Sequence, residues 1–499
     1  MSRRGYAVIL FVSLLLCYAY FFPHWADWSQ NSRFDLVLAI VDQGTLSIDA
    51  YVANTGDYAR YEGHTYSDKA PGLSFLGVPV YGLYRAVART EPVQALMERV
   101  AHNPAFADTL NEQGTGLLRE KVYQALALYV LTVATVGAPS ALLGVIVYWL
   151  LGSFTRRDAY RMGLALAFGL GTLAFPYAWA YYGHQLSAVL LFAAFAALHW
   201  MRTAGKSPWW GLAGVGFLLG YAVITEYPAA IVAGLIFIYA IYVLRNWRKV
   251  ALMIAGGIPP GLLLAAYDLA IFGTLLPVGY RYSELWQDQH STGFLSLTVP
   301  RLETLGELTF GLYRGLFVTS PYLLLGVAGF VLLWRQRRAF RAELLVSGGA
   351  ALGMLLFNSA SSMWWGGFAF GPRYMIAMLP FLAWMVVGVL EAQGAAGRWV
   401  VWLTWALVVV SAVLIGANSI AGQSFPEETV SVPTAYALER LADGDLARNL
   451  GMALGLKGWA SLIPLVGCAA VLAGLVIWKG RQTPGTLTFS EEAGGALAH

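Results

Sequence analysis

The chain has 499 residues, of which 58% are hydrophobic and 12% are charged, and its formal net charge is +4. Soluble domains contain about 45–50% apolar and about 25% charged residues, so this composition excludes an ordinary soluble protein and indicates a polytopic membrane protein. The basic residues fall in short clusters between apolar runs, which is typical of membrane topology and argues against a nucleic-acid partner. Cys17 and Cys468 lie inside apolar runs, so we expect neither a disulfide nor a metal site built from them.

The first 22 residues combine a basic start with an apolar core, as a signal peptide does, but no small-residue cleavage site follows them. We therefore predict a retained transmembrane helix over 1–22, followed by a long extracytoplasmic loop over 23–118. This loop gathers charges in a chain that has few of them, which favours acid/base chemistry at a membrane surface over a merely solvated loop. Its aspartates and main cations are Asp27, Asp35, Asp42, Asp49, Asp57 and Asp68, with Arg33, Arg60 and Lys69.

Apolar stretches of about 17–25 residues predict about twelve transmembrane helices, counting the first. The fold class is therefore an all-α polytopic membrane protein, with a transmembrane bundle over 119–478. The predicted spans are 5–22, 120–150, 159–180, 184–201, 208–224, 227–244, 250–273, 320–335, 342–358, 374–391, 399–417 and 457–478.

Basic residues cluster in alternate connections between these spans, and positive residues stay on the cytoplasmic side of a membrane. This predicts that both termini are cytoplasmic, with a disordered tail over 479–499, in a multi-pass protein of an inner or plasma membrane. The opposite, outer face then receives the first loop and the loops 274–319, 359–373 and 418–456. The segment 71–87 is apolar but short and broken by prolines and glycines, which predicts an interfacial or re-entrant helix.

Two cations on the outer face are candidates for holding a lipid phosphate. Lys69 follows Asp68 where the chain re-enters the membrane, and an ordinary interfacial lysine is the alternative interpretation. Arg373 follows the glycine-rich segment WWGGFAFG, from which a guanidinium is able to grip a phosphate through two parallel hydrogen bonds. An arginine that only anchored the topology would lie on the cytoplasmic side, which favours a functional role for Arg373.

Other polar residues of the outer face complete the candidate set. His184 opens the fourth span, where helix capping is the alternative role, and Glu226 has to meet a cation or water between two spans. Tyr280 and Arg281 belong to an aromatic and polar loop that is typical of carbohydrate surfaces and also of interfacial aromatic belts. The sequence contains no zinc-ligand spacing and no nucleotide-binding fingerprint, so it assigns no metal ligand and leaves a divalent-metal requirement open.

Taken in order, these motifs resemble those of the GT-C membrane glycosyltransferases. The resemblance rests on a first span, a large outer loop with carboxylates, a Lys-x-Pro element at Lys69, a polar residue before the fourth span and a late GPRY loop. Within that superfamily the chain is most similar to the dolichol-phosphate-mannose protein mannosyltransferases and the lipid A aminoarabinose transferase. The likeness spans most of the chain, and the order of the motifs carries it.

The resemblance implies an enzyme that moves a sugar from a polyprenyl-phosphate carrier to a lipid, glycan or protein acceptor on the non-cytoplasmic face, with inversion. It implies no cofactor beyond the lipid-linked donor. An acidic residue of the first loop acts as base in such enzymes, and cations stabilise the leaving lipid phosphate. The family's Asp-Glu pair is missing here, where the chain reads WSQNSRFD, and His184 stands where relatives tend to have an aspartate.

The sequence therefore leaves the identity of the base open between Asp35 and Asp57. Asp27 and Asp68 are the next candidates. The residues expected to bind substrate or phosphate are Lys69, Arg373, Arg33, His184, Glu226, Asp68, Tyr280 and Arg281. A multi-span transporter and a polymerase or ligase of lipid-linked glycans are the alternative functions. No internal repeat is evident in the sequence, although a transporter built from two halves is expected to show one.

Overall fold

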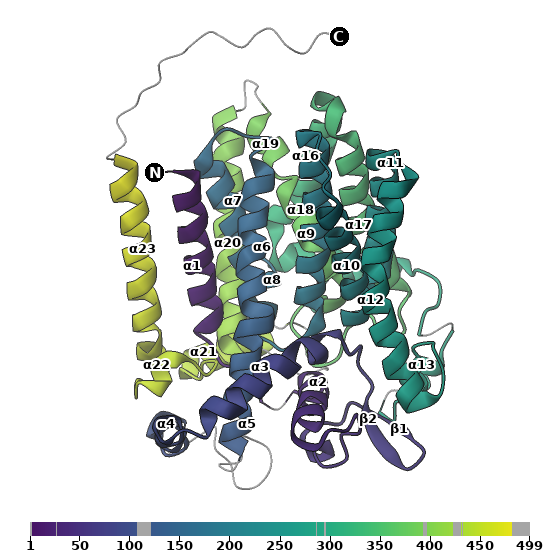
Figure 1. Ribbon diagram of the computed structural model, residues 1–499. Helices are drawn as coiled ribbons and strands as arrows, with labels where there is room; N and C mark the ends of the chain where they lie inside the picture. Colours follow the sequence, from purple (N-terminus) through teal and green to yellow (C-terminus); the bar gives the residue numbers. More distant parts are fainter. Residues whose placement is uncertain are drawn as a thin grey trace.

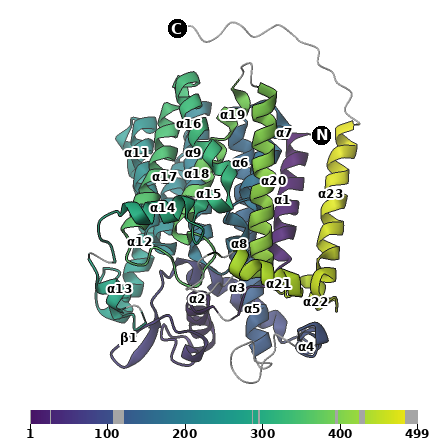
Figure 2. The same ribbon diagram turned by 180° about the vertical axis from the view of Figure 1, so that it is seen from behind.

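The computed structural model describes residues 2–25, 27–106, 121–285, 287–293, 296–392, 397–422, 431 and 433–481. These residues form a bundle of long, roughly parallel helices with a smaller set of elements packed against one end (Figures 1 and 2). We call that end the loop end, since it carries the described part of 23–118. The predictions for 107–118, for 423–430 and for the tail 482–499 lie outside the described residues.

The bundle consists of helices that coincide with all twelve predicted spans. In chain order they are α1 (Arg3–Ala19), α5 (Val122–Thr132) continued by α6 (Ala138–Leu151), α7 (Asp158–Leu170) with α8 (Ala174–Ala178), α9 (Gly183–Ala204), α10 (Trp209–Thr225), α11 (Ala229–Leu244), α12 (Trp247–Phe272), α16 (Leu324–Gln336), α17 (Arg341–Ala360), α18 (Leu379–Trp384) with α19 (Val387–Glu391), α20 (Gly397–Ala421) and α23 (Ile463–Arg481).

Seven helical segments of the described chain are long and apolar enough to cross a membrane, and three shorter apolar helices, Trp209–Thr225, Ala229–Leu244 and Pro321–Gln336, lie beside them. Many large apolar side chains on their outer surfaces are exposed, such as Ile238, Leu262 and Val413. Exposed apolar faces of this extent need a lipid environment. The predicted fold class, an all-α polytopic membrane protein, is confirmed.

The loop end is built from short elements that run across or beyond the bundle. They are α2 (Trp28–Leu38), α3 (Gly72–Ala88), α4 (Glu91–Ala101), α13 (Gln287–Ser291), α21 (Leu438–Asp443) and α22 (Leu450–Ala453). Two further short helices, α14 (Leu302–Phe310) and α15 (Leu316–Thr319), lie alongside the spans in Figure 2. Helix α3, predicted as an interfacial or re-entrant segment, lies across the end of the bundle in Figure 1. It packs against α2, α5 and α10, so it links the first loop to the spans.

A two-stranded hairpin, β1 (Tyr58–Tyr61) and β2 (His64–Ser67), stands at the loop end, and the sequence analysis did not predict it. Two residues, Glu62 and Gly63, form its turn with φ of 49° and 84°. Glycine at the second position suits the positive φ that such tight hairpin turns require. The hairpin could have been predicted from the alternating side chains of YARY and HTYS on either side of the turn Glu62-Gly63.

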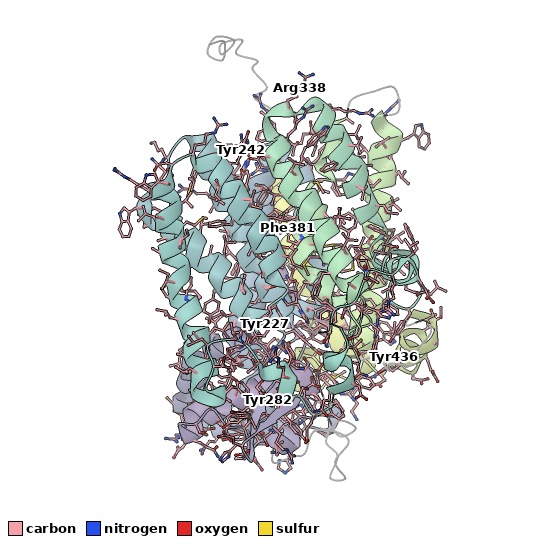
Figure 3. The ribbon with its side chains drawn as sticks, turned by 90° about the vertical axis from the view of Figure 1, so that its right-hand side faces the viewer. Tyr227, Tyr242, Tyr282, Arg338, Phe381 and Tyr436 are labelled. Atoms are coloured by element: carbon pink, nitrogen blue, oxygen red, sulfur yellow. The ribbon has the colours of Figure 1, made fainter. Side chains whose placement is uncertain are left out.

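Backbone bridges fasten the later outer loops onto this end of the molecule. Ala59 of the hairpin pairs with Ser283, and Leu297 pairs with Ser361. In the side view of Figure 3, Tyr282 lies at the loop end and Arg338 at the opposite end of the bundle. The segment around 280 therefore lies against the hairpin, and the segment around 300 lies against the chain that follows α17.

Candidate active site

The hairpin brings the two halves of a charged cluster together. Its register pairs Tyr58 with Ser67, so the residues just outside this pair, Asp57 and Asp68, become neighbours. Lys69 lies between them, with its Nζ 2.9 Å from Asp57 Oδ2 and 3.1 Å from Asp68 Oδ1. The Ser283 hydroxyl donates to Asp68 Oδ2 at 2.9 Å and fixes this carboxylate from the opposite side.

The Lys69 ammonium is almost fully buried, and its charge depends on these neighbours. Burial alone lowers the pKa of a lysine, but the carboxylates of Asp57 and Asp68 outweigh it and the pKa of Lys69 is raised. Lys69 is therefore cationic at physiological pH. With two carboxylates around one ammonium, this part of the site has no spare positive charge of its own.

A second ion pair lies at the end of α10. Glu226 follows this helix in extended conformation, and Pro228, two residues later, caps the start of α11. Arg33 of α2 donates from Nη2 to Glu226 Oε1 at 2.8 Å, and both side chains are buried. Arg33 is also bound to the carbonyl and hydroxyl oxygens of Ser29, at 2.7 and 3.0 Å.

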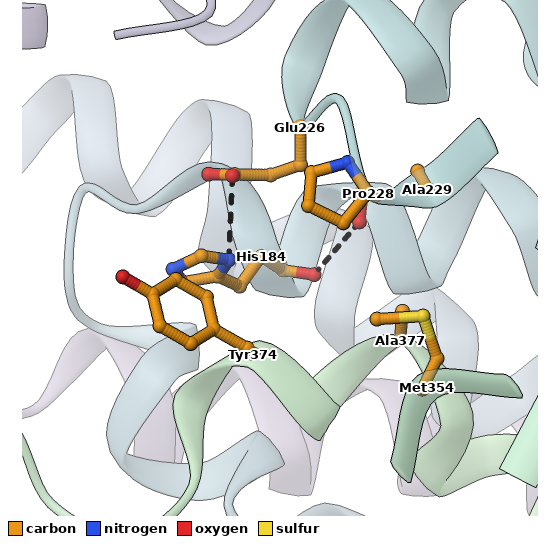
Figure 4. A pocket seen from close by; sticks show the side chains of 8 residues that line it. His184, Glu226, Pro228, Ala229, Met354, Tyr374 and Ala377 are labelled. Atoms are coloured by element: carbon orange, nitrogen blue, oxygen red, sulfur yellow. Dashed lines mark hydrogen bonds and ion pairs between the residues drawn. The ribbon is translucent and has the colours of Figure 1, made fainter. Parts of the chain in front are cut away.

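His184, the second residue of α9, faces the other oxygen of Glu226. Its Nδ1 lies 3.5 Å from Glu226 Oε2, as drawn in Figure 4. A small pocket adjoins this pair, with His184, Ser187, Glu226 and Tyr374 at its polar side and Pro228, Ala229, Met354 and Ala377 at its apolar side. The pocket therefore connects the charged cluster with apolar surfaces of α11 and α17.

Arg373 starts the helical turn at Arg373–Met378 and approaches the same cluster from a third direction. Its guanidinium lies 5.2 Å from the ring centroid of Tyr182 and 5.5 Å from that of Tyr374. Arg33, Arg373 and Lys69 are all near enough to act on the ionisation of Glu226. Within the described part of the chain no carboxylate forms an ion pair with Arg373, and its buried Nε has no hydrogen-bond partner.

Tyr280 is the last member of this cluster. Its ring packs edge-on against Tyr227, with centroids 6.0 Å apart, and burial raises the pKa of its phenol. Its neighbour Arg281 is exposed. The structure thus brings together Asp57, Asp68, Lys69, Arg33, Glu226, His184, Arg373 and Tyr280.

Asp35 is the candidate that lies elsewhere. It is two residues after Arg33 on α2, which places it about 200° further around the helix axis. Its buried Oδ1 accepts a hydrogen bond from Asn54 Nδ2 at 2.9 Å. Burial raises the pKa of Asp35 well above the usual value, against the opposing effects of Asn54 and Lys121. Asp35 therefore faces away from the charged cluster and favours its neutral form.

Three contributors to the site escaped the sequence analysis. Tyr182 lies under the Arg373 guanidinium and donates its hydroxyl to Asp27, which caps α2, at 2.5 Å. Ser283 holds Asp68 through the bridge between the hairpin and the loop after α12. Arg314 lies fully buried close to Arg373. Long-range contacts of this kind leave no local sequence pattern.

Within the described residues, no group of three or more histidines, cysteines, aspartates or glutamates is arranged to hold a metal ion.

Comparison with known proteins gives a likeness of fold. No protein-family model and no curated protein matches the chain. The crystal structure of ArnT from Cupriavidus metallidurans in the apo state is similar at 17% identity, covering 94% of this chain and 73% of that chain, with a TM-score of 0.45. The structure of ArnT from the same organism bound to undecaprenyl phosphate is similar at 16% identity, covering 96% and 80%, with a TM-score of 0.47.

Proposed function

We propose that this protein is a membrane glycosyltransferase that moves a sugar from a polyprenyl-phosphate carrier to a lipid, glycan or protein acceptor. One observation carries the proposal: carboxylates and three cations, Arg33, Lys69 and Arg373, converge in a buried cluster where a membrane bundle meets its loop end. A phosphate linked to a lipid arrives from the membrane, and its sugar has to meet polar groups at the surface. The order of motifs that resembles the GT-C family supports the same function.

Asp57 is the proposed base. In the reaction the acceptor hydroxyl gives its proton to the Asp57 carboxylate, and the acceptor oxygen forms a bond to the anomeric carbon. The bond from that carbon to the phosphate oxygen breaks, and its electron pair stays on the phosphate. Asp57 suits this role better than Asp35, because it lies in the charged cluster while Asp35 faces Asn54 and favours its neutral form.

Lys69 takes a role that differs from the one expected from the sequence. Its ammonium bridges Asp57 and Asp68, so its proposed role is to orient the Asp57 carboxylate. Arg373, which has no carboxylate partner among the described residues, is the cation best placed for the carrier phosphate. Glu226 holds Arg33 and faces His184, and this arrangement supports the pocket beside the reacting groups.

The proposal includes the predicted orientation. The loop end faces the non-cytoplasmic side, and both termini face the cytoplasm, since the basic connections lie at the other end of the bundle. Arg338 marks that end in Figure 3. The donor is a polyprenyl-phosphate-linked sugar, and the described residues are proposed to act without a resident cofactor.

A transfer assay tests the function. The purified protein in lipid nanodiscs is incubated with a panel of undecaprenyl-phosphate sugars and a native membrane-lipid extract, and release of undecaprenyl phosphate is followed by mass spectrometry. We expect release with at least one sugar for the wild type and its loss in Asp57→Asn. The exposed arginine of the α3 end gives a matched control, Arg89→Gln, which is expected to keep the wild-type rate. Equal release by wild type and Asp57→Asn would contradict the assignment of the base.

A further inference from the structure

Asp268 is a buried carboxyl group one turn before the loop end of α12, and it has no part in the transfer chemistry proposed for the charged cluster. A backbone hydrogen bond joins it to Val278, in the loop that follows the helix. Its Oδ2 atom is buried without a hydrogen-bond partner, and no cation of the described residues forms an ion pair with it. An ionisable group in a transmembrane helix that lacks a partner of its own indicates a functional site.

The preceding residue, Tyr267, also has an unused polar atom. Its ring packs edge-on against that of Phe75 in α3, with centroids 5.6 Å apart, and its buried hydroxyl has no hydrogen-bond partner. A phenol hydroxyl is both a donor and an acceptor of hydrogen bonds. Because buried polar groups are normally bonded, two adjacent residues with unused oxygen atoms indicate a ligand that carries several hydroxyl groups.

These two residues lie beside the charged cluster. Asp68 is near enough to Tyr267 to interact with it electrostatically, and Asp268 has the same relation to Tyr227. Tyr227 in turn packs edge-on against Tyr280, which belongs to the cluster. A ligand bound by Tyr267 and Asp268 is therefore placed next to the groups proposed to carry out the transfer.

The charge of this part of the site is negative. Lys69 is engaged with Asp68. Arg33 is engaged with Glu226, so neither cation is left to balance Asp268. A carboxylate accepts hydrogen bonds from hydroxyl groups and repels a second carboxylate. These groups therefore suit a neutral sugar and disfavour an acidic one.

We propose that Asp268 and Tyr267 bind hydroxyl groups of the donor sugar and select a neutral sugar over a uronic acid. This inference rests on the proposed function and narrows the class of sugar that is transferred. A site that hydrogen-bonds a substrate hydroxyl rejects an analogue that lacks it, because the buried groups of the site are then left unpaired. Repulsion between the Asp268 carboxylate and that of a uronic acid adds to this discrimination.

Donor kinetics test the proposal. Undecaprenyl-phosphate-linked pentoses and hexoses are compared with hexuronic acids in the transfer assay in nanodiscs. We expect the wild type to use a neutral sugar, and Asp268→Asn to raise the KM for that donor about tenfold with a smaller change in kcat. The preference for the neutral sugar over the uronic acid should fall about tenfold in this variant, since the repulsion is removed. Asp443→Asn, at an exposed position of α21, is the matched control.

Asp268→Asn keeps an oxygen for the backbone N–H of Val278, and unchanged binding of undecaprenyl phosphate, which has no sugar, shows that the variant is folded. Tyr267→Phe covers the case in which the asparagine variant does not fold, and it is expected to raise the same KM about threefold. Unchanged KM and selectivity in the folded variants, or a wild type that transfers only uronic acids, overturns the inference and leaves the proposed function standing. A wild type that releases undecaprenyl phosphate from no donor contradicts the proposed function itself.

Discussion

Two buried charged clusters lie at opposite ends of the helix bundle, and they differ in how their charges are balanced. At the end away from the loops, Glu343 of α17 accepts from His199 at 3.0 Å, from Arg202 Nε at 2.7 Å and from Tyr239 at 2.7 Å. The other ring nitrogen of His199 lies 2.9 Å from the Ser153 hydroxyl. One carboxylate thus ties α9, α11 and α17 together and forms an ion pair with Arg202, although Arg202 Nη2 and Glu343 Oε2 have no hydrogen-bond partner.

The cluster at the loop end is built from similar groups, but its charges are balanced differently. Arg33 forms an ion pair with Glu226, whereas no ion pair joins Arg373 or Arg314 to a carboxylate of the described residues. Buried charges that serve only stability are normally paired. This difference supports our proposal that the Glu343 cluster stabilises the fold, while the loop-end cluster is arranged for a substrate that brings its own negative charge. The following variants test this distinction.

Removing the proposed base is expected to have the largest effect. Asp57→Asn keeps the size of the side chain but cannot take a proton, so the transfer rate is expected to fall by about 10²–10⁴-fold. Undecaprenyl phosphate release measures this fall, and lipid binding by the same variant should persist. A rate within a factor of about ten of the wild type would place the base elsewhere.

Breaking the ion pair at the end of α10 is expected to affect both stability and activity. Glu226→Gln leaves the buried Arg33 without its carboxylate, which costs about 3 kcal/mol in the free energy of unfolding. The melting temperature and the transfer rate are therefore both expected to fall. A stable but inactive variant would show that Glu226 acts in the chemistry more directly than through Arg33.

The Glu343 cluster should lose stability without losing transfer activity. Glu343→Gln removes the charge that holds Arg202 and His199, and we expect a loss of about 2 kcal/mol of stability. The transfer rate per folded protein should equal that of the wild type, as measured at a temperature well below both melting transitions. An activity loss without a stability loss would remove the contrast between the two clusters.

Asp35→Asn is expected to have the smallest effect and a characteristic pH dependence. The pKa of Asp35 is raised, so its contribution to stability is full below the ordinary carboxyl pKa of about 3.9 and is lost as the pH rises through the raised value. The asparagine variant stays neutral, so its melting temperature should rise relative to that of the wild type as the pH rises from the ordinary carboxyl pKa through the raised one. Its transfer rate should match the wild type, and a rate loss like that of Asp57→Asn would reinstate Asp35 as the base.

The sequence was sufficient to predict the spans and several residues that the structure brings together in the candidate site, for a physical reason. Apolar runs have to match the thickness of a bilayer, so each predicted span coincides with a helix or a pair of helices. An ionisable side chain next to such an apolar run costs free energy unless it has a partner or a function. For this reason Glu226, Arg373 and His184 could be predicted as site residues. Each of these three side chains lies in the charged cluster.

What the sequence left open depends on contacts between distant segments. The choice between Asp35 and Asp57 required the direction of each side chain, which follows from the helix α2 in one case and the hairpin register in the other. Arg314 meets the turn at Gly367, 53 positions later in the chain. No periodicity or spacing encodes such a contact, so only the folded structure shows it.

The most direct test of the central claim is native mass spectrometry of the protein released from native membranes. If the loop-end cluster binds the phosphate of a polyprenyl carrier, a polyprenyl phosphate should co-purify with the wild type and with Glu343→Gln, and it should be absent from Arg373→Gln. Retention of this lipid by all three proteins, or its absence from the wild type in every preparation, would contradict the account.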